Sequence, residues 1–150
     1  MVSAHPLVPK ATVDAFLLSK SGFILDALAS LEKKAESPAI PRYTEAELKA
    51  YITALCHRVY PLFERRGVLF PQIKFRRMVS RWGSCHAGRG LITFNLNLAY
   101  APDDCIRYVV FHEFCHFLEA NHSPKFYAEL SAICPDWKTL RKQLKEVNIP

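Results

Sequence analysis

His112-Glu113-Phe114-Cys115-His116 carries the strongest structural signal in this sequence, an H-E-x-x-H pattern. On a helix, residues i and i+4 lie on the same side, so both imidazoles can bind one ion. Neutral imidazole is a favoured zinc ligand, and Glu113 can take a proton from water and return it to a leaving group. Chance gives about 0.014 such matches per chain of this composition. The pattern therefore predicts a zinc-hydrolase centre on a helix.

A catalytic zinc site needs a third protein ligand, and we predict that it is His122. A continuous helix would carry His122 roughly 15 Å along the axis from His112. The chain must therefore turn back between Glu119 and Asn121, where Asn121 tolerates a left-handed backbone. Glu119 is a rival ligand because it lies three residues after His116. Its other interpretation is a carboxylate that orients a ligand histidine.

Helix signals continue on both sides of the motif. The helix that carries it is predicted to begin around Pro102-Asp103-Asp104, since proline suits the first turn and acidic residues complement the positive helix end. Ser123-Pro124 is typical of an N-cap followed by a first helical residue and predicts the next helix. Pro135 separates that helix from a last basic helix, which is expected to end near Lys145.

Upstream, a helix and two strands are predicted. Thr44 and Glu47 form a capping box that opens the helix, Pro61 is expected to kink it, and Gly67 to end it. The strands cover Ile73–Val79 and Leu91–Asn95, which we expect to form a small antiparallel sheet.

The segment between the two strands, Arg81–Gly90, is rich in turn residues. Within it, Gly83 is expected to permit a tight turn and Trp82 to cover the core. Helices followed by strands and then by helices indicate an α+β fold.

The chain begins with a separate segment. Its apolar pattern predicts a helix after Thr12, and the prolines between Lys33 and Arg42 predict a linker. We therefore expect residues 1–42 to be a helical lead-in and linker and residues 43–150 to be the functional domain, together one compact unit. A length of 150 residues, half of them hydrophobic, is consistent with one domain.

The composition also bears on location. Five irregularly spaced cysteines contain no C-x-x-C pair, so neither a disulfide framework nor a thiolate zinc cluster is expected. No secretion signal and no membrane-spanning run is evident, so we expect a cytoplasmic protein without a membrane partner.

The net charge of +6 is unevenly distributed. Arg65 to Pro102 contains no acidic residue, and its seven basic residues lie between Arg65 and Arg89. Such a segment can attract nucleic acid or acidic substrates. A solvated strand face is the simpler interpretation, because few aromatic residues are interleaved with the charges.

Four segments of the chain resemble the YgjP-like metallopeptidase family, which is related to the SprT-like and WLM zinc peptidases. They are Met78–Cys85, Leu91–Asn95, Tyr108–Phe117 and Asn121–Tyr127. The resemblance implies a zincin-like domain, with an active-site helix below a small sheet and the metal between them. It also implies that His112, His116 and His122 are zinc ligands and Glu113 the general base. Tyr127 stands where the family commonly has tryptophan.

The expected function is zinc-dependent hydrolysis of a peptide or protein substrate. We expect an extended peptide to pair with the edge of the Leu91–Asn95 strand. The group that stabilises the oxyanion is not fixed by the sequence, and the candidates are Tyr127, Tyr100, Arg81 and His86.

Two alternatives remain open. The arginines between Arg76 and Arg89 suggest a metal-dependent nucleotide or phosphate-ester hydrolase. A non-catalytic, zinc-containing nucleic-acid-binding module would instead use the basic segment Arg65–Arg89, but such a module has no need for Glu113 beside the ligands.

Overall fold

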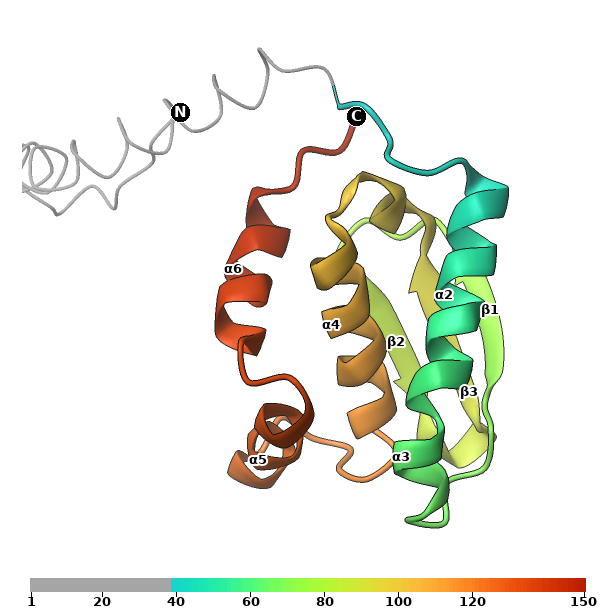
Figure 1. Cartoon of the computed structure of the whole chain (residues 1–150), viewed down its shortest axis with the longest axis vertical. Helices are drawn as coiled ribbons and strands as arrows, with labels where there is room; N and C mark the ends of the chain where they lie inside the picture. Colours follow the sequence, from blue (N-terminus) through green and yellow to red (C-terminus); the bar gives the residue numbers. More distant parts are fainter. Residues whose placement is uncertain (1–38) are drawn as a thin grey trace, which may run out of the picture. The chain divides into compact units, whose positions relative to one another are not determined.

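Two helices cover one face of a small sheet in the part of the chain that the structure describes, residues 39–150 of a computed structural model (Figure 1). The helices that pack on each other over the sheet are α2 (Glu45–Val59) and α4 (Asp103–Cys115). Phe94 and Ile92 of the sheet and Phe114 of α4 are fully buried in the core between these layers. The predicted helix after Thr12 and most of the predicted 1–42 segment lie outside the described residues.

The first described helix confirms the predicted capping box. The Thr44 hydroxyl accepts a hydrogen bond from the Glu47 amide, and the Glu47 carboxylate accepts one from the Thr44 amide at 2.8 Å. Pro61 does more than kink this helix. α2 ends at Val59, and Pro61 begins the separate short helix α3 (Pro61–Glu64), because proline cannot continue the amide ladder of α2.

The sheet has three strands in the order β1-β3-β2. They are β1 (Gln72–Arg76), β2 (Gly83–His86) and β3 (Leu91–Asn95). β3 has the predicted bounds, whereas β1 ends before the predicted Val79. The prediction of an antiparallel sheet is wrong for one pair, because β1 runs parallel to β3 and only β2 is antiparallel to it.

The sheet differs from the prediction because of β2, a strand that was not predicted from the sequence. β2 lies in the segment expected to be a turn, and Gly-Ser-Cys-His contains no residue that favours strands. It forms a hairpin with β3 through the short 3₁₀ helix η1 (Ala87–Arg89). β2 therefore pairs with one edge of β3 in the antiparallel orientation, and β1 pairs with the other edge in the parallel orientation.

The second half of the domain positions the motif. A 3₁₀ helix, η2 (Leu96–Tyr100), leads from β3 into α4, with Pro102 as the N-cap residue and acidic residues in the first turn. Beyond α4 follow α5 (Pro124–Ile133) and α6 (Trp137–Glu146), and both pack against α4. The predicted start of α5 and the last basic helix are thereby confirmed.

All five cysteines are free, and three of them, Cys56, Cys105 and Cys115, are fully buried. They contribute to the core as small apolar side chains. Within residues 39–150, no helix has the length and apolar character needed to cross a membrane.

Candidate metal centre

The H-E-x-x-H motif lies across the C-terminal end of α4. The helix ends at Cys115, and His116 is its cap residue, still in the right-handed conformation. The amides of His116, Phe117 and Leu118 bond to carbonyls three residues back, which tightens the last turn. His112 and Glu113 are thus fixed on regular helix, while His116 lies where the chain leaves the helix axis.

His122 reaches the same place because the chain reverses directly after α4. Ser123 caps α5, and its hydroxyl accepts a hydrogen bond from the Phe126 amide at 3.3 Å. The Ser123 amide donates to the Asn121 carbonyl at 2.8 Å. The reversal is confirmed, and it needs no left-handed backbone at Asn121, since among the described residues only glycines have positive φ.

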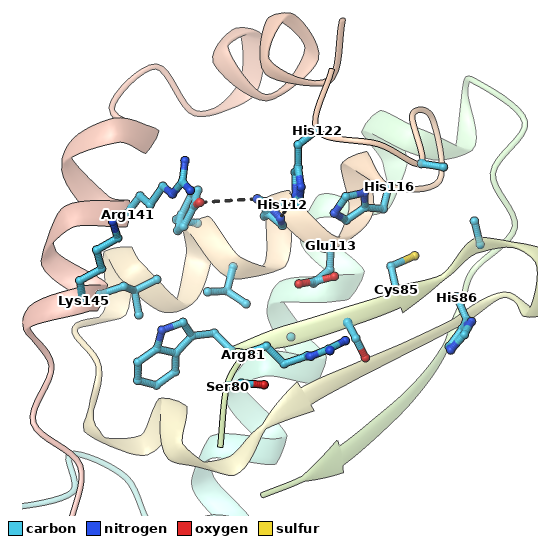
Figure 2. Close-up of a pocket in the computed structure, with 18 of the residues that line it drawn as sticks. Ser80, Arg81, Cys85, His86, His112, Glu113, His116, His122, Arg141 and Lys145 are labelled. Atoms are coloured by element: carbon cyan, nitrogen blue, oxygen red, sulfur yellow. Dashed lines mark hydrogen bonds between the residues drawn. The ribbon is translucent and has the colours of Figure 1, made fainter. Parts of the chain in front are cut away.

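The three histidines converge on one point. One ring nitrogen from each lies within 4.8 Å of the others, and the Nε2 atoms of His112 and His122 are 3.0 Å apart. Figure 2 shows the three rings together at the same place in the cleft, above Glu113. Nitrogens bound to zinc at 2.0–2.1 Å in a tetrahedral site lie about 3.3 Å apart. The donor set and its spacing therefore fit one zinc ion.

The other ring nitrogens of two histidines face protein oxygens. His116 Nδ1 lies 3.2 Å from the carbonyl oxygen of Glu119, and His112 Nδ1 makes a longer contact of 3.5 Å with the Tyr108 hydroxyl. Such contacts on Nδ1 leave Nε2 for a metal and fix the orientation of the ring. The contact of Tyr108 with His112 was not predicted from the sequence, although Tyr108 lies one helical turn before His112.

Glu119 contributes its backbone here and not its carboxylate. Its carboxylate lies 3.5 Å from Lys125 Nζ. Within residues 39–150, the only group of His, Cys, Asp or Glu side chains with metal-binding spacing is the histidine triad. The geometry therefore favours His122 over Glu119 as the third ligand.

The surroundings of His112 and His116 favour the neutral imidazole, which is the form that binds metal. Burial, with a smaller effect of the neighbouring His116 and His122, lowers the pKa of His112 to about 3. Burial also lowers the pKa of His116, although the Glu119 carbonyl opposes this shift.

One buried ring supports all three histidines. The Phe126 ring centroid lies 5.0 Å from that of His112, 4.7 Å from that of His116 and 4.9 Å from that of His122. Phe126 is fully buried on α5. Packing of this kind limits ring rotation and holds the three nitrogens in place.

Glu113 lies against the first residue of β2. Its side chain is 5% exposed, and burial raises the pKa of its carboxyl to about 8, against the opposing effect of the Arg81 guanidinium. A Cβ on Gly83 would lie 2.6 Å from Glu113 Oε1. Gly83 is thus needed for this close approach, and the tight turn expected at Gly83 is wrong, because Gly83 is a strand residue without positive φ.

We expect Gly83→Ala to reduce kcat/KM of the predicted hydrolase reaction on the order of 100-fold, because the added methyl clashes with the Glu113 carboxylate and displaces it. Zinc bound per protein should stay unchanged, since the histidines are not touched. Gly88→Ala is the matched control, because Gly88 lines the same cleft but a Cβ there meets nothing within 4 Å. Wild-type activity in Gly83→Ala would contradict this role for Gly83.

The metal centre opens into a cleft of about 770 Å³. α4 and β2 form two of its walls, and the segment Ser80–Trp82 and the C-terminal half of α6 complete it. Of the four oxyanion candidates, Arg81 and His86 line the cleft. Tyr127 stacks between His122 and Trp137 instead, and neither it nor Tyr100 is a lining residue.

A buried asparagine holds the segment before β2 in place. Asn95, 2% exposed at the end of β3, donates from Nδ2 to the carbonyls of Met78 and Arg81, both at 2.7 Å. The side-chain oxygen Oδ1 accepts hydrogen bonds from the backbone amides of Met78 at 3.2 Å and Asn97 at 3.0 Å. The backbone amide of Asn95 donates to the Trp82 carbonyl at 2.9 Å. The wall that carries Arg81 is therefore attached to the sheet.

The basic segment Arg65–Arg89 does not form a single surface. Arg66 pairs with Glu129 of α5 at 2.9 Å, whereas Arg81 lines the cleft. Lys74 and Arg76 alternate with half-buried residues on β1 and lie on the face of the sheet away from the core. The nucleic-acid partner predicted for this segment remains a prediction.

Comparison with known proteins assigns this domain to a family. Residues 36–147 match the family model described as YgjP-like, metallopeptidase domain. The chain belongs to the YgjP-like metallopeptidase family. The resemblance predicted from the sequence is thereby confirmed. No curated protein matches the sequence.

Two solved structures resemble the YgjP-like domain. The metallopeptidase zymogen abylysin of Pyrococcus abyssi has a TM-score of 0.55 at 15% identity, over 62% of this chain and 90% of that one. The metallopeptidase zymogen jannalysin of Methanocaldococcus jannaschii has a TM-score of 0.55 at 16% identity, over 65% and 97%. At such identities the likeness concerns the fold alone, and it confirms the α+β, zincin-like architecture.

Proposed function

We propose that this YgjP-like domain is a zinc-dependent peptidase in which Glu113 is the general base. One observation carries the proposal. Three imidazoles converge beside a buried carboxylate, at the base of a cleft large enough for a peptide segment.

Each residue of the centre has a separate task. His112, His116 and His122 would hold the zinc ion, which when bound supplies a Lewis acid that polarises a carbonyl and acidifies water. Glu113 accepts the proton of the attacking water on a carboxylate oxygen and passes it to the leaving nitrogen. Burial of Glu113 favours this transfer, because a desolvated carboxylate is a stronger base than an exposed one.

Arg81 is our candidate for stabilising charge on the substrate oxygen. It lines the cleft, and its guanidinium lies close enough to Glu113 to oppose the rise in the pKa of that carboxyl. In Figure 2 its side chain extends along the cleft below Glu113. A fixed cation beside the reacting centre favours the transition state of acyl transfer.

The edge that offers itself to an extended peptide belongs to β2. The sequence favoured β3 for this purpose, but β3 is the central strand and both of its edges are paired. Within residues 39–150, β2 pairs along one edge only, with β3, and its residues Gly83–His86 line the cleft. Backbone pairing along this strand would supply affinity without selecting side chains.

The function is tested on the zinc-loaded full-length chain with unfolded casein and, in parallel, nucleoside triphosphates. We expect casein cleavage that a chelator abolishes and added zinc restores, with no release of phosphate. Casein cleavage that persists after zinc has been removed to below one tenth of the protein concentration would contradict a metallopeptidase. Hydrolysis of the nucleotides alone would contradict the peptide substrate.

A second candidate function is hydrolysis of a nucleotide or phosphate ester. It is favoured by three cations in the cleft, Arg81, Arg141 and Lys145, which would suit a phosphate. The parallel assay separates it from the first. A non-catalytic, zinc-containing nucleic-acid module predicts instead steeply salt-dependent binding that survives Glu113→Gln. The cytoplasmic location and the boundary between residues 42 and 43 stay predictions.

A further inference from the structure

The last helix gives the cleft a cationic wall. The buried residues of α6 are Trp137, Leu140 and Leu144, and α6 packs against α4. Next to this buried face, basic residues recur at the spacing i, i+3, i+4 and i+7, which places them on one side of a helix. They are Lys138, Arg141, Lys142 and Lys145. We call this row the α6 stripe.

The α6 stripe extends from the cleft onto the neighbouring surface. Arg141 and Lys145 line the cleft, and with Trp137, Lys138 and Lys142 they also line an adjoining hollow of about 340 Å³. Figure 2 shows Arg141 and Lys145 together on α6 at the end of the cleft opposite His86.

The balance of charge in the cleft is one-sided. Among the described residues that line it, Glu113 is the sole acidic one, and the proposed mechanism uses it as a base. Arg81, Arg141 and Lys145 are the cations. A low-dielectric cleft lined by one sign of charge concentrates ligands of the other sign.

We propose that the α6 stripe is a specificity subsite that binds the carboxylates of acidic peptide substrates next to the bond that is cleaved. The inference rests on the proposed peptidase function and adds its substrate class. From Lys138 to Lys145 the helix rises about 10 Å, which is about the length of three residues of an extended peptide. The stripe can therefore serve more than one acidic residue, with Arg141 and Lys145 closest to the reacting bond.

A peptide suits this surface better than a nucleic acid does. Single-stranded nucleic acids are held by bases stacked on exposed aromatic rings as well as by charge. The one aromatic residue that lines the hollow, Trp137, is 8% exposed, and Lys138 Nζ lies over its ring at 5.6 Å from the centroid. A peptide needs only a strand edge and cations, and β2 and the stripe residues Arg141 and Lys145 supply these on two walls of one cleft.

The test compares peptides that differ only in charge, on the zinc-loaded full chain. One peptide carries glutamate on either side of the scissile bond, and its partner carries glutamine. We expect wild type to cleave the glutamate peptide with a kcat/KM on the order of tenfold higher, and more salt to shrink the ratio. Arg141→Gln or Lys145→Gln should bring the ratio towards one, because each lowers kcat/KM for the glutamate peptide more than for the glutamine peptide. Arg58→Gln, an exposed arginine of α2 outside the cleft, should leave the ratio unchanged.

Binding to the Glu113→Gln protein, measured by fluorescence anisotropy, separates the two proposals. Tighter binding of the glutamate peptide that is lost with Arg141→Gln supports the subsite. Failure of wild type to cleave either peptide would contradict the peptidase function without changing this binding result. Cleavage of both peptides at equal rates overturns the subsite and leaves the peptidase intact. Tighter binding of an oligonucleotide than of the glutamate peptide, with the same sensitivity to Arg141→Gln, overturns the subsite in favour of nucleic acid. Amidation of the peptide's C-terminus shows whether the bound carboxylate is a side chain or the chain end.

Discussion

Glu113→Gln should abolish peptide hydrolysis and leave the zinc in place. Glutamine has the shape of glutamate, so it fits the same space against Gly83. It cannot accept a proton from water, and general-base catalysis contributes about 10²–10⁴-fold. We therefore expect kcat/KM on a peptide to fall by about 10³-fold, within that range. Zinc per protein, measured by atomic emission, should match wild type.

Glu119→Gln is the matched control for this experiment. It makes the same chemical change six residues away, on a carboxylate that lies near Lys125 and not in the histidine triad. Activity should stay within about threefold of wild type, because a long ion pair with an exposed lysine contributes little. A Glu113→Gln protein that keeps full turnover would remove Glu113 from the mechanism. One that loses its zinc would make Glu113 part of the metal site.

His122→Ala should weaken zinc binding by more than about 100-fold, since even contacts behind the ligands are typically worth 10–100-fold. His122 is exposed and precedes the N-cap of α5, so the variant should fold. Zinc stabilises a protein that binds it only when folded, by about 2.7 kcal/mol at a concentration 100 times Kd. Thermal unfolding of wild type should therefore shift upward with added zinc, and that of His122→Ala at the same zinc concentration should not.

Two controls make the result specific. His86→Ala removes a histidine that lines the same cleft but lies outside the triad, and it should bind zinc as wild type does. Glu119→Ala keeps the backbone carbonyl that contacts His116, so it should also bind zinc. Loss of zinc from Glu119→Ala, with retention in His122→Ala, would exchange the two as third ligand.

The parts of the fold that the sequence predicts are those encoded by neighbouring residues. The capping box at Thr44, the start of α5 at Ser123 and the bounds of β3 are all local patterns, and the structure has each of them. The triad is almost local, because His112, His116 and His122 lie within eleven residues and only one chain reversal brings them together. That is why its convergence could be predicted.

The features that were not predicted depend on contacts between distant segments. β2 is a strand because β3 pairs with it, and the residues Gly83–His86 have no intrinsic preference for one. Gly83 is required by Glu113, thirty residues later, and not by its own backbone. Phe126 and Arg141 enter the site from α5 and α6, and no spacing motif links them to the histidines. For Arg141, the basic row on α6 was the available signal.

The hydrogen bonds made by Asn95 determine how freely the residues of this cleft wall can vary. Every hydrogen bond that Asn95 makes to the segment Met78–Trp82 ends on a backbone atom, so the attachment does not depend on which side chains the segment carries. Selection, or a protein engineer, can therefore exchange residues such as Val79 and Ser80 without detaching the segment from the sheet. The Asn95 side chain would then hold segments of different sequence in the same position beside an unchanged histidine triad.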